Sequence, residues 1–471
     1  MKLSKNTAIE ILNAGLQTGA DYAEIYFQDD CTHSYSRRYK KVQNVSESRT
    51  CGFGIRLLKG TKQVYGYTSN PSKASLIKLA TDLSLGFDGD RVLTVSNLKE
   101  KKKKKNINPI KIKHSEWDTE KKLKYLEEGE EVAYSVSDKI RDVSTGLLED
   151  DEHVEVYNSD GIMIQDDRVR TRLIVSAVAS DNNQFQNSYM GPGLSKGLEL
   201  LEEVDFKKVC SDVANEALAL LSAPEGPSGE MPVILGNYFG GVLFHEACGH
   251  PLEGSAICRK ESPFTGKLGQ KIASDVVNAF DDGTIENGWG SENFDDEGNE
   301  PTKNQLIKDG VLTSYMLDKY TARRIDSTLK ATGACRRESY RYLPTTRMTN
   351  TYIGGGTSTV EEIFKSVKNG IYCKGFTGGQ VDPSTDQFIF TSDIAYVIKD
   401  GKIDHMIKPV SLMGYGYEIL NRITMVGNDC TRAPGVCGAS SGSCYVEVGQ
   451  PTLLISHMLV GGSGGEQEWN Y

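Results

Sequence analysis

The chain has 471 residues, 38% of them hydrophobic and 25% charged, which is enough for two or three domains with substantial cores. Its net charge of −10 argues against a nucleic-acid-binding protein, whose surface would be basic. The longest apolar stretch, residues 233–244, is too short for a membrane span and is interrupted by glycines. We therefore expect neither a nucleic-acid partner nor a membrane partner.

The start of the chain indicates a cytoplasmic protein. No positively charged start followed by an apolar run, as in a signal peptide, is present, and an amphipathic helix built on Ile9, Ile11, Leu12 and Leu16 is predicted instead. The 10 cysteines follow no disulfide framework. Reduced thiols are therefore the expectation.

The next segment is predicted to contain strands and then a helix. Residues 21–28 favour a strand, and residues 34–69 favour several short strands of alternating character. Asn70 and Pro71 are predicted to supply the N-cap and the first-turn proline of a helix that ends near Leu85.

A lysine-rich tract at residues 99–105 lacks interleaved aromatic residues, so it is predicted to be a solvated linker, near 99–113, between two subregions. A helix is expected over residues 116–139. A hairpin is expected over 155–178, with its turn at residues 159–161. Residues 1–224 are therefore predicted to form an N-terminal α+β domain.

From about residue 225 the chain has glycine-rich turns, β-branched runs and few long helices. Strand runs at residues 388–398 and 453–460 favour a curved or barrel-like sheet. Residues 225–471 are therefore predicted to form a β-rich, barrel-like catalytic domain. The fold class predicted for the whole chain is α+β.

Two of only 7 histidines, His245 and His250, flank Glu246 in this second region. Two imidazoles and a carboxylate can supply metal ligands and a general base. Their spacing of five places the rings about 140° apart on a straight α-helix. A π-turn would realign them, and Gly249 and Pro251 favour a distorted turn there. The alternative is a buried helix whose histidines are satisfied by ordinary hydrogen bonds.

Further motifs carry a family resemblance. They lie at residues 347–353, 375–383, 425–430, 433–438 and 448–453. Together with the histidine motif, they strongly resemble the TldD/PmbA family of metallopeptidases. The resemblance implies that His245, His250 and Cys437 bind one Zn²⁺ per chain, with Glu246 as the catalytic base. A thiolate is a suitable zinc ligand, so the chemistry agrees.

Other residues were weighed for the same site. Cys430, Cys437 and Cys444 are equally spaced and could form a structural zinc site, but no C-x-x-C pair accompanies them. Cys248 is expected to pack in the core, away from the metal. Arg347 and His405 are candidate oxyanion helpers, although a surface salt bridge and a satisfied histidine are the preferred interpretations.

The resemblance implies a zinc-dependent peptidase that acts on unfolded or extended peptides inside a dimer cavity. A sheet edge beside the metal would allow a peptide to bind as an added strand. The implied partner is a second copy of the chain or a related subunit without the histidine motif. Two alternatives remain: a non-catalytic, metal-stabilised peptide-binding or scaffold subunit, and a thiol-redox enzyme using Cys437 or Cys444.

Overall fold

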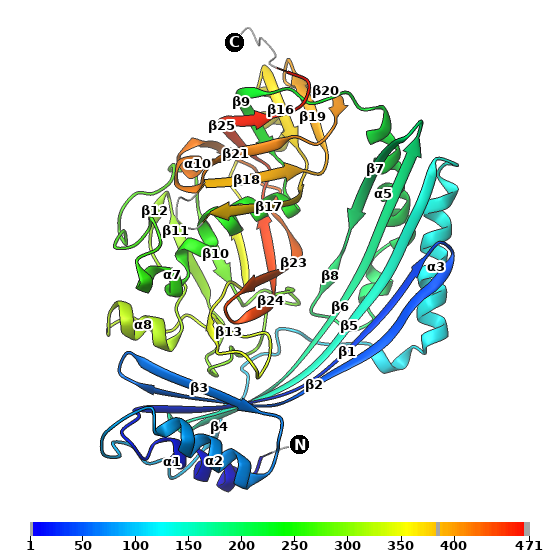
Figure 1. The fold of residues 1–471 in the computed structure, drawn as a ribbon. Coiled ribbons are helices and arrows are strands. Elements are labelled where there is room, and N and C mark those ends of the chain that lie inside the picture. The colour runs from blue at the N-terminus through cyan, green and yellow to red at the C-terminus, as the bar shows by residue number, and fades with distance from the viewer. Residues whose placement is uncertain (1–2, 383–386, 466–471) are drawn as a thin grey trace.

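The computed structural model describes residues 3–382 and 387–465, and it confirms the mixed α+β fold (Figure 1). The N-terminal half forms one long, curved sheet, and the β-rich C-terminal half lies against its concave side (Figure 1). Four long strands form most of the curved sheet: β1 Tyr22–Arg38, β2 Lys41–Lys59, β5 Ile140–Asn158 and β6 Ile162–Asp181. Within the described ranges, no helix combines the length and apolarity that crossing a membrane requires.

The strand order of this sheet is β3-β2-β1-β5-β6-β4, and β7 and β8 also pair with β6. The shorter strands are β3 Lys62–Thr68, β4 Lys99–Glu100, β7 Gln184–Met190 and β8 Gly193–Leu194. The helices are α1 Lys5–Gly15, α2 Lys73–Ser84, the 3₁₀ turn η1 His114–Glu116, α3 Thr119–Ser135, α4 Leu200–Glu203 and α5 Phe206–Ser222. Helices α1 and α2 cover one end of the sheet, and α3 and α5 cover the other (Figure 1).

Several local predictions need correction. Of the short strands expected over residues 34–69, only β3 is short, because the rest of the segment belongs to β1 and β2, which run to 17 and 19 residues. The second helix begins after Ser72, whose hydroxyl accepts a hydrogen bond from the Ser75 amide, so Asn70 is not its N-cap. The linker tract contributes β4 to the same sheet, which therefore runs through both subregions. The predicted hairpin turn between β5 and β6 is confirmed.

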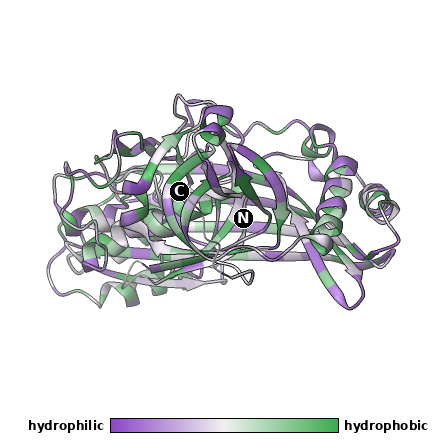
Figure 2. Ribbon diagram, turned by 90° about the horizontal axis from the view of Figure 1, so that it is seen from above, coloured by the Kyte–Doolittle hydropathy of each residue, from purple (hydrophilic) through white to green (hydrophobic). Residues whose placement is uncertain are grey.

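The C-terminal half contains two main sheets whose strands curve around one another when viewed from above (Figure 2). The nine-stranded sheet has the order β17-β18-β21-β25-β9-β16-β19-β20, with β22 beside β25. Its strands are β9 Gly229–Leu235, β16 Asn369–Cys373, β17 Phe376–Asp382, β18 Gln387–Ser392, β19 Ala395–Lys399, β20 Lys402–Ile407, β21 Ser411–Tyr415, β22 Ile423–Val426 and β25 Leu453–Gly461. The run predicted at 388–398 is therefore two strands.

The six-stranded sheet has the order β12-β11-β10-β15-β24-β23, so β23 is an edge strand. Its strands are β10 Ala279–Asp282, β11 Lys303–Lys308, β12 Val311–Leu312, β15 Asn350–Ile353, β23 Thr431–Ala439 and β24 Gly442–Gln450, and a separate pair is β13 Cys335–Arg336 with β14 Thr345–Thr346. The helices of this half are α6 Val242–Phe244, α7 Gly254–Arg259, α8 Lys319–Ile325, α9 Val360–Lys365 and α10 Gly416–Arg422. One large apolar core fills the space between the two sheets and includes Phe244 and Met348.

Buried ion pairs join the two halves of the molecule. Arg56 of β2 donates to Glu297 at 2.7 Å, and Arg168 of β6 donates to Asp296 at 2.9 Å. All four side chains are almost fully buried. The segment around residue 296 is therefore fixed to the concave face of the N-terminal sheet.

Candidate metal centre

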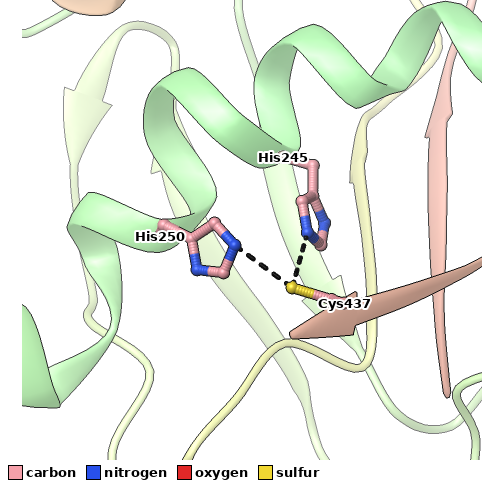
Figure 3. A group of neighbouring side chains, drawn as sticks. All are labelled: His245, His250 and Cys437. Carbon is pink, nitrogen blue, oxygen red and sulfur yellow. Dashed lines mark hydrogen bonds between the residues drawn. The ribbon is translucent and has the colours of Figure 1, made fainter. Parts of the chain in front are cut away.

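The histidine motif lies on a helical segment that changes its winding along its length. A 3₁₀ turn, η2 Tyr238–Gly241, leads into α6, then into a π-turn, η3 His245–Gly249, and finally into a 3₁₀ turn, η4 His250–Leu252. The amide of His250 bonds to the carbonyl of His245, five residues earlier. The π-turn predicted from the histidine spacing is confirmed, and it brings the two rings to the same side (Figure 3).

Three side chains from two distant parts of the chain converge at this turn (Figure 3). The Sγ atom of Cys437, on β23, lies 3.3 Å from His245 Nε2 and 3.1 Å from His250 Nε2. The two rings are nearly perpendicular, with centroids 5.1 Å apart. Each side chain therefore places one potential metal-ligand atom near a common point.

This donor set fits a zinc ion. Tetrahedral zinc with two imidazoles and a thiolate separates its nitrogen and sulfur ligands by about 3.6 Å, so the three side chains need to move apart only slightly. Among the described residues, His245 Nδ1 is buried without a hydrogen-bond partner. His245 is therefore not the satisfied core histidine of the alternative interpretation.

The two histidines differ electrostatically. Burial, together with the positive charges of His250 and Arg347, lowers the pKa of His245 well below its ordinary value, so its ring is neutral. Burial also opposes the charging of His250, but Glu253 and Cys437 outweigh it and raise the pKa of His250 well above the ordinary value. The location thus attracts positive charge, which a proton or a divalent cation can supply.

Glu246 lies beside the three potential metal ligands but is not one of them. Its Oε2 atom is 3.8 Å from His250 Nε2, and its side chain remains partly exposed. Burial, followed by the negative charge of Glu253, raises the pKa of Glu246, whereas His250 opposes that rise. A carboxylate in this position can exchange a proton with a molecule held next to the three donors.

Glu253 and Arg347 are buried next to the potential metal ligands and contact them. Glu253 Oε2 accepts a hydrogen bond from His250 Nδ1 at 3.3 Å, and Glu253 Oε1 lies 3.7 Å from Arg347 Nε. Arg347 also donates to the carbonyl oxygens of Cys437 and Gly442. The expectation of a surface salt bridge for Arg347 is wrong, because this side chain is fully buried.

Sequence reasoning missed Glu253, although a signal was present. It follows His250 by three residues, a spacing that places two side chains on one helical face. A carboxylate that orients a ligating histidine is a frequent partner of metal sites. His405, by contrast, is exposed on β20 and bonds to Asp404 at 2.7 Å, outside the cluster.

The other cysteines lie outside the donor cluster of the described residues. Cys444 faces Cys437 across the β23–β24 pair and is buried near Arg347. Cys430 donates weakly to the carbonyl of Ile353 at 3.5 Å. Cys248 is buried in the large apolar core, where a packing role was expected. The three-cysteine structural zinc site finds no support in this arrangement.

Comparison with known proteins places the chain in a family. Residues 23–84, 112–221 and 228–462 match domain 1, the central domain and the C-terminal domain of the PmbA/TldA metallopeptidases. The metalloprotease TldD homolog of Haemophilus influenzae is 37% identical, over 98% of this chain and 97% of that protein. The chain belongs to the TldD/PmbA family of metallopeptidases.

Other TldD/PmbA relatives agree. A metalloprotease of Methanothermobacter thermautotrophicus is 31% identical, over 95% of this chain and 97% of that protein. The solved structure of TldE from Thermococcus kodakarensis shares the fold, with a TM-score of 0.75 and 17% identity, over 94% of this chain and 97% of that chain. The predicted family is thereby confirmed. Pro383, at the end of one motif behind the resemblance, lies outside the described residues.

A pocket of about 370 Å³ lies between the two halves of this TldD/PmbA member, and neither the three potential metal ligands nor Glu246 is among its lining residues. Both halves of the chain line it, with Arg172 and Tyr189 from the N-terminal sheet facing Tyr238, Phe376 and Val436. Val436 directly precedes Cys437 on the edge strand β23, and Phe376 begins the edge strand β17 of the other sheet. The pocket therefore lies between two strand edges.

Proposed function

We propose that the protein is a zinc-dependent peptidase that cleaves unfolded or extended peptides. One observation carries the proposal: two imidazole nitrogens and a thiol sulfur converge, and the Glu246 carboxylate lies 3.8 Å from one of those nitrogens. Two histidines, a cysteine and a separate carboxylate are the groups that a catalytic zinc site with one open position requires.

His245, His250 and Cys437 would hold the metal. When bound, zinc lowers the pKa of water to about 7 and polarises a carbonyl oxygen. Glu246 accepts the proton of the attacking water at a carboxylate oxygen and then returns it to the leaving amine. Glu253 keeps Nδ1 of His250 protonated, so that Nε2 faces the metal.

The substrate is proposed to bind along a strand edge. Strand β23 is the last strand of its sheet and pairs with β24, and the exposed Val436, which precedes Cys437, lines the pocket. An extended peptide laid along this edge gains main-chain hydrogen bonds with little demand on its sequence. The apolar lining of the pocket then accommodates one side chain of the peptide.

The scaffold alternative requires a closed metal site with four protein ligands. The cluster of donors in the described part of the chain has three members, and Cys248, Cys430 and Cys444 are not among them. This count supports the peptidase. Cytoplasmic location, and pairing with a second copy or with a related subunit lacking the histidine motif, also remain proposals.

The test compares metal content and cleavage of an unstructured peptide mixture for the wild type, Glu246→Gln and Cys437→Ala. We expect one zinc in this centre of the wild-type chain, the same zinc content with at least a 100-fold loss of activity in Glu246→Gln, and one zinc fewer per chain in Cys437→Ala. Glu261→Gln, which alters an exposed carboxylate, is the control and should stay active. Stoichiometric zinc without cleavage in any variant would favour the scaffold, and absence of zinc affinity would refute the proposed centre.

A further inference from the structure

A second group of metal-ligand side chains lies on the outer face of the N-terminal sheet, away from the C-terminal half. It consists of Cys31 and His33 on β1 and Glu47 on β2, and their donor atoms all lie within 4.8 Å of one another. Cys31 and His33 are two residues apart and therefore share one face of the strand. His33 is directly paired with Glu47 in the antiparallel register, with 3.5 Å between His33 Nε2 and Glu47 Oε2.

This group occupies a gap between the two helical layers. On the same face of β1, Ala23, Ile25 and Phe27 pack in the core formed with α1 and α2. Further along, Tyr35 belongs to the core formed with α3. Cys31 and His33 lie between these cores and are only partly buried, so a small ion can reach them from solvent.

Three of the chain's histidines lie on this face, and His33 differs from the other two. Both ring nitrogens of His114 have partners, Asp151 at 2.7 Å and Thr171 at 2.8 Å. Both ring nitrogens of His153 also have partners, Asp167 and Glu155. Among the described residues, His33 Nδ1 is buried without a hydrogen-bond partner. One nitrogen of its ring is therefore left without an ordinary partner in the described part of the chain, whereas the other faces Glu47.

The charges around the group favour a cation. Burial, followed by the negative charges of Glu47, Asp151 and Asp30, raises the pKa of the Cys31 thiol. The nearest basic groups already have carboxylate partners: Arg49 pairs with Asp29 at 2.7 Å, and Lys122 pairs with Glu149 at 2.8 Å. The negative charges that disfavour a free Cys31 thiolate also attract a divalent ion. Once bound, that ion stabilises the thiolate that binds it.

We propose that Cys31, His33 and Glu47 form a second metal site, which takes one divalent ion of the zinc or cobalt class. Sulfur, imidazole nitrogen and carboxylate oxygen together suit zinc better than magnesium or calcium, which prefer oxygen ligands. On binding, the metal–sulfur bond forms as the Cys31 proton passes to solvent. The ion then links β1 to β2 where, among the described residues, neither helical layer covers the sheet.

The test is a cobalt titration of the full chain after its metal has been removed by a chelator. A Cys437→Ala background disables the first site, and thiolate-to-cobalt charge-transfer absorption reports sulfur ligation. We expect one equivalent of cobalt with sulfur ligation in this background. Adding Cys31→Ser should abolish the absorption, and adding His33→Ala should weaken binding by about tenfold or more.

The matched control is Cys51→Ser, which removes an exposed thiol from the neighbouring strand and should leave the absorption intact. If Cys437→Ala does not fold, the same titration of the otherwise native chain should show two equivalents that fall to one with Cys31→Ser. Absorption that survives Cys31→Ser, or that disappears with Cys51→Ser, would overturn the proposal. Its failure would leave the peptidase proposal untouched, because cleavage is measured separately.

Discussion

Single residues hold the three proposed metal ligands in position. His250 is oriented by Glu253, and Glu253 in turn lies against Arg347, which also holds the Cys437 carbonyl. One buried carboxylate therefore connects the helical ligands to the ligand on β23. Replacing it removes no proposed metal ligand, so its effect measures how its hydrogen bond and its charge support those ligands.

Glu253→Gln is expected to lower zinc affinity by about 10- to 100-fold, because a neutral amide holds the His250 ring less firmly. Competition with a chelator of known affinity measures this change. Glu261→Gln serves as the control, since the Glu261 carboxylate is exposed and pairs with Arg259. An unchanged affinity in Glu253→Gln would contradict the orienting role.

His153 gives a pH-dependent prediction at the same scale. Hydrogen bonds that the His153 ring donates to Asp167 and then to Glu155 raise the pKa of His153 to about 9, against about 6.5 in the unfolded chain. The charged ring therefore stabilises the fold fully below pH 6.5, and this contribution is lost as the pH rises through 9. Because the ring is more than a third exposed, we expect only about 1 kcal/mol.

Urea unfolding of the wild type and His153→Gln between pH 6 and pH 10 measures this contribution. The difference in unfolding free energy should be largest at pH 6 and should vanish by pH 10. Asp167→Asn, which removes the main partner, should show the same trend. A difference that does not vary with pH would refute the assignment.

The site could be predicted from sequence only in part, and the residues show why. The spacing of His245 and His250 predicted both a metal site and a π-turn, and the π-turn is confirmed, because helical geometry is local. Cys437 came from a family resemblance, since it is 192 positions from His245 and no local rule connects them. Arg347 was misjudged because its burial depends on the packing of β23 and β24 around it.

Among the secondary-structure elements, the helical segment that carries His245 and His250 is positioned by close contact with β24. A Cβ atom added at Gly241 would lie 2.4 Å from backbone atoms of Gly449. Backbone within a paired strand cannot move aside as a flexible side chain can. The start of the helical segment therefore touches β24 at a point that admits only glycine.

Gly241→Ala should destabilise the protein by about 1 to 3 kcal/mol and lower zinc affinity, because the helix must move away from β24. Thermal unfolding and chelator competition test the two effects. Gly355→Ala is the matched control, since its nearest neighbouring atom would be 3.9 Å away. Equal losses in both variants would show that the close contact is not the cause.

The long strands illustrate what sequence patterns cannot provide. Residues 41–50 of β2 are nearly all exposed, so no buried face marks them as part of one long strand. Their extended form depends instead on pairing with β1, in a register that shifts between Val42 and Asn44. Where one face was buried, as in the β5–β6 hairpin, the prediction was correct.

For the whole molecule, buried ion pairs cross the boundary between the two halves. Glu297 accepts from Arg56 across that boundary, and both side chains are fully buried. Leaving one partner of a buried ion pair unmatched costs about 3 to 5 kcal/mol. The two halves are therefore expected to depend on one another for stability.

Glu297→Gln should lower the unfolding free energy by about 3 to 5 kcal/mol, as measured by chemical denaturation of the full chain. Glu300→Gln lies in the same loop and breaks an exposed pair with Lys104, so its cost should be at most about 1 kcal/mol. If the two variants lost equal stability, burial of the Arg56–Glu297 pair would not be the source of its contribution.

The distance in sequence between the ligands has a consequence during synthesis. Cys437 leaves the ribosome 192 residues after His245, roughly 10 to 40 seconds later at ordinary rates of translation. The strand that carries it is also unsupported until β24 has followed and paired with it. A nascent chain therefore has no complete proposed zinc centre until most of it has been made. Protein synthesis itself thus delays the appearance of peptidase activity beside the ribosome.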